Sequence, residues 1–413
     1  MADFSSLFSF YYPYPKIPES ALVDGGNGLF YGTARNGGSN DLGCIYSFNV
    51  LTKGYETVHS FSETDGADPV AALVDGGNGL FYGTTQYGGT NGVGCVYSFN
   101  LLTKGYETVY SFSGGTDGAN PFASLVDGGN GVFYGTTING GTNDLGCIYS
   151  FNLLTKGYET VHSFSGTDGA NPVAALVDGG NGLLYGTTLY GGTNGLGCIY
   201  SFNVLTKGYE TVHSFSGTDG ANPRAALVDG KNGLFYGTTQ NGGTNDFGCV
   251  YSFNLLTKGY ETVNSFSGTD GAYPYAALVD GGNGLFYGTT LNGGTNDLGC
   301  IYSFNLLTKG YETVHSFSGT DGANPVAALV DGKNGLFYGT TANGGTNSFG
   351  CLYSFNLLTK GYETVYSFSG GTDGANPRAA LVDGKNGLFY GTTLYGGTNS
   401  LGCIYSFNVL TKG

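Results

Sequence analysis

The sequence contains no tryptophan, a single methionine, and only 15 lysines and arginines against 30 aspartates and glutamates. Its formal net charge of −15 argues against nucleic acid or an anionic membrane as a partner, because both carry negative charge themselves. No apolar run approaches the length of a transmembrane helix, so no membrane span is predicted. The segment 1–20 lacks the basic and apolar regions of a signal peptide, which predicts a cytoplasmic protein.

Motifs that identify a reaction are missing as well. The sequence has no nucleophile elbow, no Ser/His/Asp arrangement, no phosphate-binding glycine loop followed by lysine, and no evident pair of catalytic carboxylates. It also has no C-x-x-C, no Cys/His cluster and no EF-hand string, so no metal site is predicted. These absences favour a protein that is not an enzyme and that uses no cofactor.

A repeated unit fills almost the whole chain instead. The stretch Leu73–Thr85, LVDGGNGLFYGTT, returns eight times with small changes, and each unit carries one cysteine. The cysteines are spaced by 51 or 52 residues: Cys44, Cys95, Cys147, Cys198, Cys249, Cys300, Cys351 and Cys403. A fixed period of this size indicates a repeat architecture, so residues 1–413 are predicted to form a single domain of eight near-identical units.

Each unit is expected to form four antiparallel strands. In the second unit these are Ala72–Val74, Leu80–Thr85, Cys95–Leu102 and Tyr106–Phe112, all rich in residues that favour strands. Asn-Gly pairs predict hairpin turns, and Gly105 is expected to supply the positive φ of the turn before the fourth strand. Eight such units predict an all-β, eight-bladed β-propeller; the alternative, an open solenoid, would leave two end sheets exposed.

The two ends of the chain favour the propeller over the solenoid. Residues 4–24 align without gaps to residues 158–178, so the N-terminus supplies a fourth strand that no first three precede. The C-terminus stops after a third strand. Pairing of Phe4–Phe10 with Cys403–Leu410 would therefore complete the last blade and remove two open edges.

The pattern P-x-A-x-L, D-G, Y-G-T-T-x-x-G-G, G-x-(I/V)-Y-S-F and F-S-G-T-D-G-A-N-P resembles the Gloeo/Verruco type of bacterial tandem repeat. This resemblance covers nearly the whole chain and implies a propeller-like fold. It carries over no catalytic or binding residues. Members of that family are often exported and anchored at the C-terminus, and this chain shows neither feature. The near-identity of the units suggests recent amplification or deliberate construction.

The eight cysteines are predicted to be free, buried thiols. Equivalent positions in neighbouring blades would lie about 13 Å apart if the cysteine strand is the third from the axis, whereas a disulfide needs Cα atoms within about 7 Å. A reduced, buried cysteine behaves as a small hydrophobic residue.

Two sets of aspartates and one set of histidines recur in the units. The aspartates of D-G-x-N-G could form a ring that holds a cation, but we expect each one to cap its own turn. The aspartates of T-D-G are likewise expected to form turns. The histidines share one position near the end of the fourth strand, where other units carry Phe8, Tyr110, Asn264 or Tyr366, so we interpret them as packing residues: His59, His162, His213 and His315.

Variation between the units is concentrated in two loops, after G-T-T and after the proline. The expected topology places both loops on one face, where function on a rigid scaffold usually lies; neutral drift is the alternative. The first hypothesis is a monomeric, lectin-like binding module for a glycan or peptide, and the second is a purely structural repeat protein. The candidate contact residues are Arg35, Tyr87, Asn139, Tyr190, Asn241, Asn292, Asn343 and Tyr395 in the first loop and Arg224, Tyr275 and Arg378 in the second.

Overall fold

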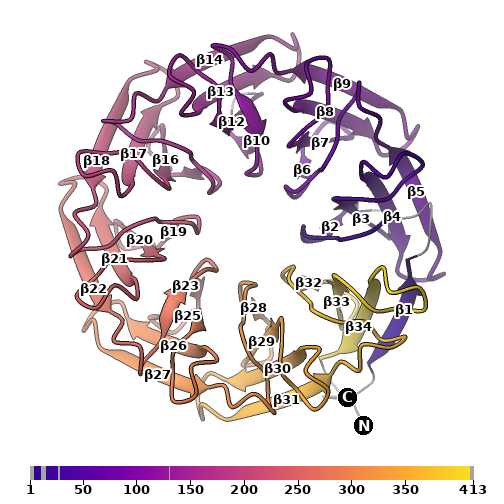
Figure 1. Cartoon of the computed structure of the whole chain (residues 1–413), viewed down its shortest axis with the longest axis vertical. Coiled ribbons are helices and arrows are strands. Elements are labelled where there is room, and N and C mark those ends of the chain that lie inside the picture. The colour runs from indigo at the N-terminus through magenta and orange to yellow at the C-terminus, as the bar shows by residue number, and fades with distance from the viewer. Residues whose placement is uncertain (1–3, 11–14, 27, 130, 410–413) are drawn as a thin grey trace. The chain divides into compact units, whose positions relative to one another are not determined.

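The structure, a computed structural model, describes residues 4–10, 15–26, 28–129 and 131–409. These residues form strands, turns and loops, with no helix among them and hence none that could span a membrane. Residues 1–58 and 266–413 make one compact unit, unit 1, and residues 59–265 make the other, unit 2. The described residues form eight antiparallel sheets, six with four strands and two with a fifth, short strand, which confirms the all-β, eight-bladed propeller class (Figure 1).

Four blades are built around residues 59–265, and three of them pair their strands in the order of the sequence, whereas in the fourth the short strands β10 and β11 both pair with β12. Their strands are β6 (Val74–Asp75), β7 (Leu80–Thr85), β8 (Cys95–Asn100), β9 (Tyr106–Ser111); β10 (Ala119–Pro121), β11 (Val126–Asp127), β12 (Val132–Asn139), β13 (Cys147–Asn152), β14 (Tyr158–Ser163); β15 (Val177–Asp178), β16 (Leu183–Thr188), β17 (Cys198–Asn203), β18 (Tyr209–Ser214); β19 (Val228–Asp229), β20 (Leu234–Thr239), β21 (Cys249–Asn254) and β22 (Tyr260–Ser265).

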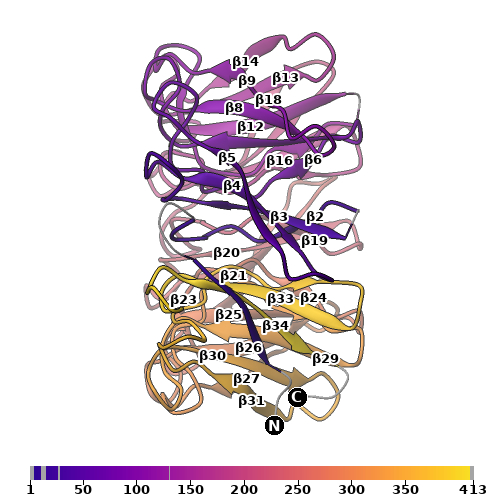
Figure 2. The same ribbon diagram turned by 90° about the vertical axis from the view of Figure 1, so that its right-hand side faces the viewer.

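The other four blades repeat this plan (Figure 2). Their strands are β2 (Val23–Asp24), β3 (Leu29–Ala34), β4 (Cys44–Asn49), β5 (Tyr55–Ser60); β23 (Ala272–Pro274), β24 (Val279–Asp280), β25 (Leu285–Asn292), β26 (Cys300–Asn305), β27 (Tyr311–Ser316); β28 (Val330–Asp331), β29 (Leu336–Thr341), β30 (Cys351–Asn356), β31 (Tyr362–Ser367); β32 (Val382–Asp383), β33 (Leu388–Thr393), β34 (Cys403–Asn408) and β1 (Ser5–Ser9).

The predicted strands of the second unit agree with β6–β9 except at four ends. The first strand begins and ends later than expected, because only Val74 and Asp75 pair with β7, and the fourth strand ends at Ser111, one residue before the predicted Phe112. The third strand ends at Asn100, whose side-chain oxygen accepts hydrogen bonds from the backbone N–H groups of Leu102 and Thr103 at 2.9 and 2.8 Å. These bonds turn the chain two residues before the apolar pattern of the sequence stops.

The turn before the fourth strand differs from the prediction in which residue is left-handed. Lys104 has φ 56°, whereas the expected Gly105 is not among the positive-φ residues. The Lys104 N–H donates to the Asn100 carbonyl at 2.8 Å, and the N–H of Asn100 donates to the Gly105 carbonyl at 2.9 Å. Closing the loop between those two bonds requires the left-handed residue one position earlier than the glycine. The lysine adopts this conformation in each described turn of the type: Lys53, Lys104, Lys156, Lys207, Lys258, Lys309 and Lys360.

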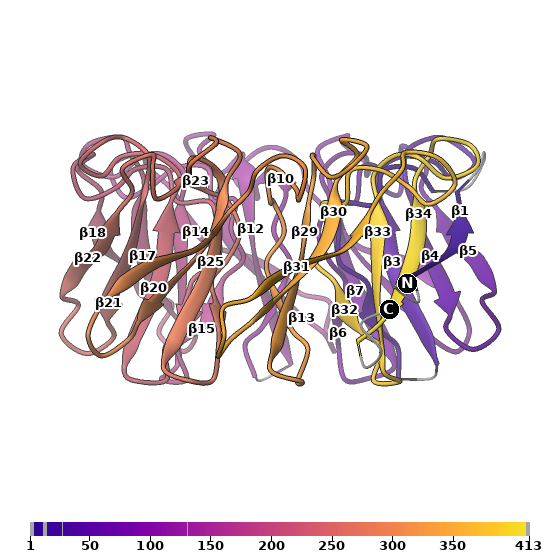
Figure 3. The same cartoon turned by 90° about the horizontal axis from the view of Figure 1, so that it is seen from below.

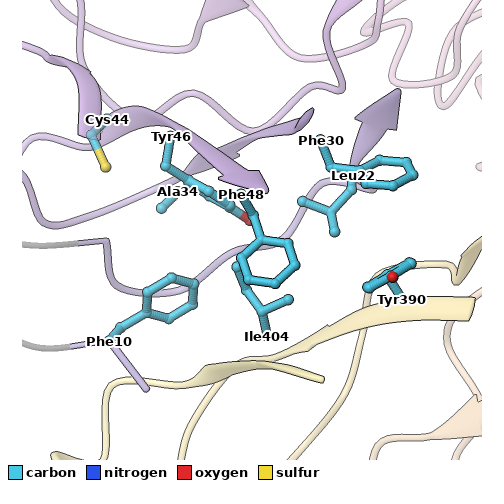
Figure 4. Packing of buried hydrophobic residues seen from close by; sticks show 9 residues of the cluster. All are labelled: Phe10, Leu22, Phe30, Ala34, Cys44, Tyr46, Phe48, Tyr390 and Ile404. Carbon is cyan, nitrogen blue, oxygen red and sulfur yellow. The ribbon is translucent and has the colours of Figure 1, made fainter. Parts of the chain in front are cut away.

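The first strand of the chain pairs with the last, as predicted. Strand β1 runs antiparallel to β34, with Ser5 opposite Ser406 and Ser9 opposite Cys403 (Figure 3). Leu410, the predicted end of this pairing, lies outside the described residues. Phe10 follows β1 and is fully buried in a cluster with Phe48, Tyr46 and Ile404 (Figure 4). The segment that begins with β1 therefore contributes Phe10 to the buried cluster between the last blade of the chain and the blade formed by β2–β5.

The cysteine prediction is confirmed in the structure, where all eight thiols are free and buried. Each one begins a third strand, and several donate to a backbone carbonyl, as Cys198 does to that of Asp168 at 3.1 Å. Burial raises the pKa of the Cys198 thiol to about 11, so this thiol stays protonated and unreactive at neutral pH.

Candidate functional site

The two variable loops of each repeat are joined to one another, as the predicted shared face requires. In the repeat that forms β15–β18, the Ala170 N–H donates to the Tyr190 carbonyl at 2.8 Å and the Tyr190 N–H donates back at 3.1 Å. The same bridge joins Ala67 to Tyr87 and Ala375 to Tyr395. The loops lie at one end of the strands and the lysine-containing turns at the other (Figure 3). We call the loop end the variable face.

The predicted tyrosines of this face are exposed. Tyr87, Tyr190 and Tyr395, the rim tyrosines, expose 43, 50 and 51 % of their surface, and Tyr275 exposes 40 %. A left-handed glycine follows each rim tyrosine; after Tyr190 this is Gly191, where a Cβ would lie 2.5 Å from the Gly169 carbonyl carbon. The backbone beneath the ring is therefore fixed, while the ring itself is not needed to fill the core.

The predicted asparagines have a different role from the tyrosines. Asn139 donates to the Asn120 side-chain oxygen at 3.0 Å and accepts from the Asn171 amide at 3.4 Å. Asn343 lies in the same way between Asn324 and Asn376, at 3.1 and 3.3 Å. Asn241 donates to Asn222 at 3.0 Å, and Asn292 to the Asp297 carbonyl at 3.5 Å. These side chains hold loops together, so their amides already have hydrogen-bond partners within the protein.

The loop asparagines that precede proline connect one blade to the next, and sequence reasoning missed them. Asn222 is left-handed at φ 56°, and its amide donates to the Leu189 carbonyl of the previous blade at 2.9 Å. Asn120, Asn171, Asn324 and Asn376 make equivalent bonds to the carbonyls of Gln86, Ile138, Leu291 and Ala342. Asparagine before proline in five of the eight units was the available signal, since asparagine tolerates the left-handed conformation better than most residues.

The three predicted arginines form local contacts on the variable face. The Arg224 Nε donates to the Gln240 side chain at 2.6 Å, and the Arg378 Nε donates to the Asn376 side chain at 2.8 Å. Arg35 lies 3.7 Å from Glu19. In the first repeat Ala34 occupies the place of the second threonine of G-T-T. Arg35 therefore lies one position before the residue that forms the loop bridge, and Asn36 forms this bridge instead.

The aspartates of D-G-x-N-G cap their turns, as predicted. The Asp178 side chain accepts from the Gly180 N–H at 2.9 Å, and the other seven aspartates make the same bond: Asp24, Asp75, Asp127, Asp229, Asp280, Asp331 and Asp383. Among the described residues no group of three or more His, Cys, Asp or Glu side chains could hold a metal ion.

The histidines lie in a contact between blades that we call the histidine clasp. The His162 Nε2 lies 3.0 Å from a carboxylate oxygen of Asp168, and its ring stacks on Tyr209 of the next blade at 3.7 Å between centroids. The Tyr209 hydroxyl donates to the Asp168 carbonyl at 2.6 Å. A histidine paired with a carboxylate can act as a general base, but Tyr110 replaces the histidine in one blade and makes the same two contacts, with Asp117 and Tyr158. The clasp therefore joins blades, which confirms the packing role.

The stability of the protein should fall as the histidines become protonated. Burial lowers the pKa of His59, His162, His213 and His315, and the nearby carboxylates oppose this effect only in part. The unfolded chain then binds more protons than the folded chain as the pH falls below about 6.5. The free energy of unfolding is therefore highest above this pH and decreases as the pH falls through the folded-state pKa. We expect the melting temperature to drop between about pH 7 and about pH 5.

Tyrosine provides the control for this effect, because it naturally replaces histidine at Tyr110 and Tyr366. Replacing all four histidines with tyrosine should flatten the pH dependence of the melting temperature over the same range. A wild-type melting temperature that stays constant or rises on acidification would contradict the role of the clasp.

The repeats match one family of sequences, the Gloeobacter/Verrucomicrobia repeat, over residues 2–181, 106–288, 160–336 and 277–413. The chain belongs to the Gloeobacter/Verrucomicrobia repeat family. The overlapping matches cover nearly all of its length, which confirms the resemblance that the sequence motifs indicated. No curated protein matches this member of the family in sequence.

Solved structures that resemble this repeat protein show its fold alone. One is the extracellular domain of a candidate hybrid two-component system from B. thetaiotaomicron, at 11% identity and TM-score 0.52, covering 95% of this chain and 51% of the other. Another is a candidate 6-phosphogluconolactonase from Bacteroides uniformis, at 13% identity and TM-score 0.51, covering 81% and 94%. Identities this low carry no information about activity.

Proposed function

We propose that this repeat protein is a non-catalytic binding module whose variable face binds glycans through the rim tyrosines. The observation that supports the proposal is the half-exposed Tyr190 ring on a loop with a fixed backbone. A flat aromatic ring with one polar tip suits the apolar face and the hydroxyl groups of a sugar. Because the loop is held by hydrogen bonds before binding, little ordering is required when the ligand arrives.

Polar residues of the next blade lie beside the loop that carries Tyr190. Asn222 bonds to the carbonyl of Leu189, the residue before Tyr190, and Arg224 follows Asn222 by two positions. We call the boundary between two consecutive blades a seam. Tyr190 and Arg224 lie on either side of one seam, where a ring and a cation can contact one ligand. The seam at Tyr87 carries Phe122 in the arginine position, with 38 % of its surface exposed. We infer that the seams at Tyr87 and Tyr190 share a stacking residue but differ in which sugars they accept.

Each seam offers only one or two anchors, so single sites should be weak. Several seams can engage a branched or repeating glycan at once, and linked weak sites gain affinity through effective concentration. This proposal assigns no catalytic residue, cofactor or metal to the protein.

The test is glycan binding by a triple variant, Tyr87→Ala, Tyr190→Ala and Tyr395→Ala. We expect the wild type to bind a subset of an immobilised glycan array and the triple variant to lose that binding. Unfolding free energy should change by no more than about 0.5 kcal/mol per substitution, because the rings are exposed. Thermal unfolding of the variant measures this separately from binding.

The opposite end of the strands supplies a matched control. Leu102, Leu205 and Leu358 lie in the lysine-containing turns and expose 88, 80 and 89 % of their surface. Replacing these three leucines with alanine removes a similar number of exposed apolar side chains and should leave glycan binding intact. Equal loss in both variants would indicate non-specific adsorption. Binding of acidic peptides with no glycan binding would contradict the glycan proposal, and absence of both ligands would favour the purely structural role.

A further inference from the structure

The seams between blades are closed by ion pairs near the lysine-containing turns. In four seams a glutamate from the fourth strand of one blade meets the turn lysine of the next blade. These pairs are Glu107 with Lys156, Glu159 with Lys207, Glu210 with Lys258, and Glu312 with Lys360. Glu159 and Lys207 line a groove of about 350 Å³, together with Val204 and Tyr134.

The seam between β1 and β4 has a serine in the place of the acid of this pair. Strand β1 carries Ser5 where the other fourth strands carry glutamate, since Ser5 lies opposite Ser406 just as Glu159 lies opposite Ser150. The turn lysine, Lys53, makes no ion pair among the described residues and lines a groove of about 390 Å³. Within the described residues this seam therefore keeps the cation and the groove of its counterparts but not the carboxylate.

The walls of this groove are partly apolar. Leu7, Val50 and Leu388 line it and pack against the buried cluster. Tyr390 and Ser406 complete the lining with hydroxyl groups, and the Tyr390 hydroxyl accepts a hydrogen bond from Asn386 at 2.9 Å. Tyr390 extends from β33 toward Phe30 and Phe48 of the neighbouring blade (Figure 4).

We propose that this groove binds a small organic carboxylate, whose carboxylate pairs with Lys53 in the place that glutamate fills in the other seams. The apolar part of the ligand contacts Leu7, Val50 and Leu388. Because Lys53 is exposed and the ion pair is partly solvated, the charge contributes modestly and the apolar contact supplies the rest. This site lies at the other end of the strands from the rim tyrosines and is independent of the proposed glycan binding.

The experiment measures binding of 4-fluorobenzoate by fluorine NMR, with neutral 4-fluorobenzamide as the control ligand. The wild type should bind the carboxylate at one site and the amide about threefold more weakly. Binding should also weaken at about 1 M NaCl, where the Debye length is about 3 Å. Ser5→Glu restores the missing acid and Lys53→Gln removes the cation, so each variant should weaken carboxylate binding about threefold or more. Lys53 is exposed and Ser5 is half-buried, so the two substitutions do not both depend on the same packing contacts.

Unit 2 provides the reciprocal test. Glu159→Ser removes the acid beside Lys207 and should create a second carboxylate site in a protein that keeps the first. The proposal is overturned if the wild type does not bind the carboxylate, if Ser5→Glu and Lys53→Gln leave binding unchanged, or if Glu159→Ser adds no second site.

Discussion

Removing residues 1–10 should lower the melting temperature by more than about 10 °C. The deletion takes away β1, and with it the aromatic contacts of Phe4 with Tyr366, of Phe8 with Tyr55, and of Phe10 with Tyr46. Loss of one buried phenylalanine side chain costs about 3–5 kcal/mol, and each kcal/mol shifts the melting temperature of a large domain by about 2–4 °C. Thermal unfolding by circular dichroism measures the effect.

The same deletion exposes the backbone edge of β34, which β1 covers in the intact protein. An uncovered edge strand pairs readily with other chains, so we expect dimers or larger oligomers by size-exclusion chromatography. A peptide with the sequence of residues 4–10 should restore part of the lost stability when added in excess, and a peptide with Phe10→Ser should restore less. A truncated protein that stays monomeric with an unchanged melting temperature would contradict the role of β1.

The single substitution with the largest expected effect is Gly186→Ala. Gly186 on β16 lies opposite Tyr200 on β17, whose ring is fully buried over the glycine. A Cβ at Gly186 would lie 2.5 Å from the Tyr200 Cζ atom and 2.9 Å from the Leu176 Cδ2 atom, so the buried ring would have to move. Overpacking of this kind costs about 1–3 kcal/mol, measurable as a lower midpoint in urea unfolding.

Two further variants test the cause of that effect. Gly208→Ala is the control, because Gly208 has no left-handed φ and its nearest neighbour within reach is the Thr206 Oγ1 at 3.3 Å, in an exposed turn. We expect it to change stability little. Adding Tyr200→Leu to Gly186→Ala should recover part of the loss by making room for the methyl group. A double variant whose loss is the sum of the two single losses would show that the ring and the methyl group do not compete.

The repeat, the strands and the turn caps of this protein could be predicted from its sequence alone. A short run of strand-favouring residues between glycine-rich turns predicts β7 over Leu80–Thr85, because strand preference and turn residues are both local properties of the chain. The aspartate caps were predictable for the same reason, since Asp178 bonds to a residue only two positions away. The gapless alignment of residues 4–24 with 158–178 predicted that β1 is a fourth strand paired with β34, because the missing strand at one end is the spare at the other.

The contacts that the repeated side chains make between blades became apparent from the tertiary structure. The Asn222 amide bonds to the Leu189 carbonyl, and the His162 ring stacks on Tyr209. Ser5 and Lys53 line one groove, where other blades pair a glutamate with the lysine. In each case the two residues come from consecutive blades. The repeat in the sequence shows that such residues recur. Whether two of them touch depends on how one blade is placed against the next, and the residue pattern of a single unit does not contain that information. For the same reason Asn139 and Tyr190, at one position of the variable loop, have different roles: the amide reaches a neighbouring asparagine, whereas the ring extends into solvent.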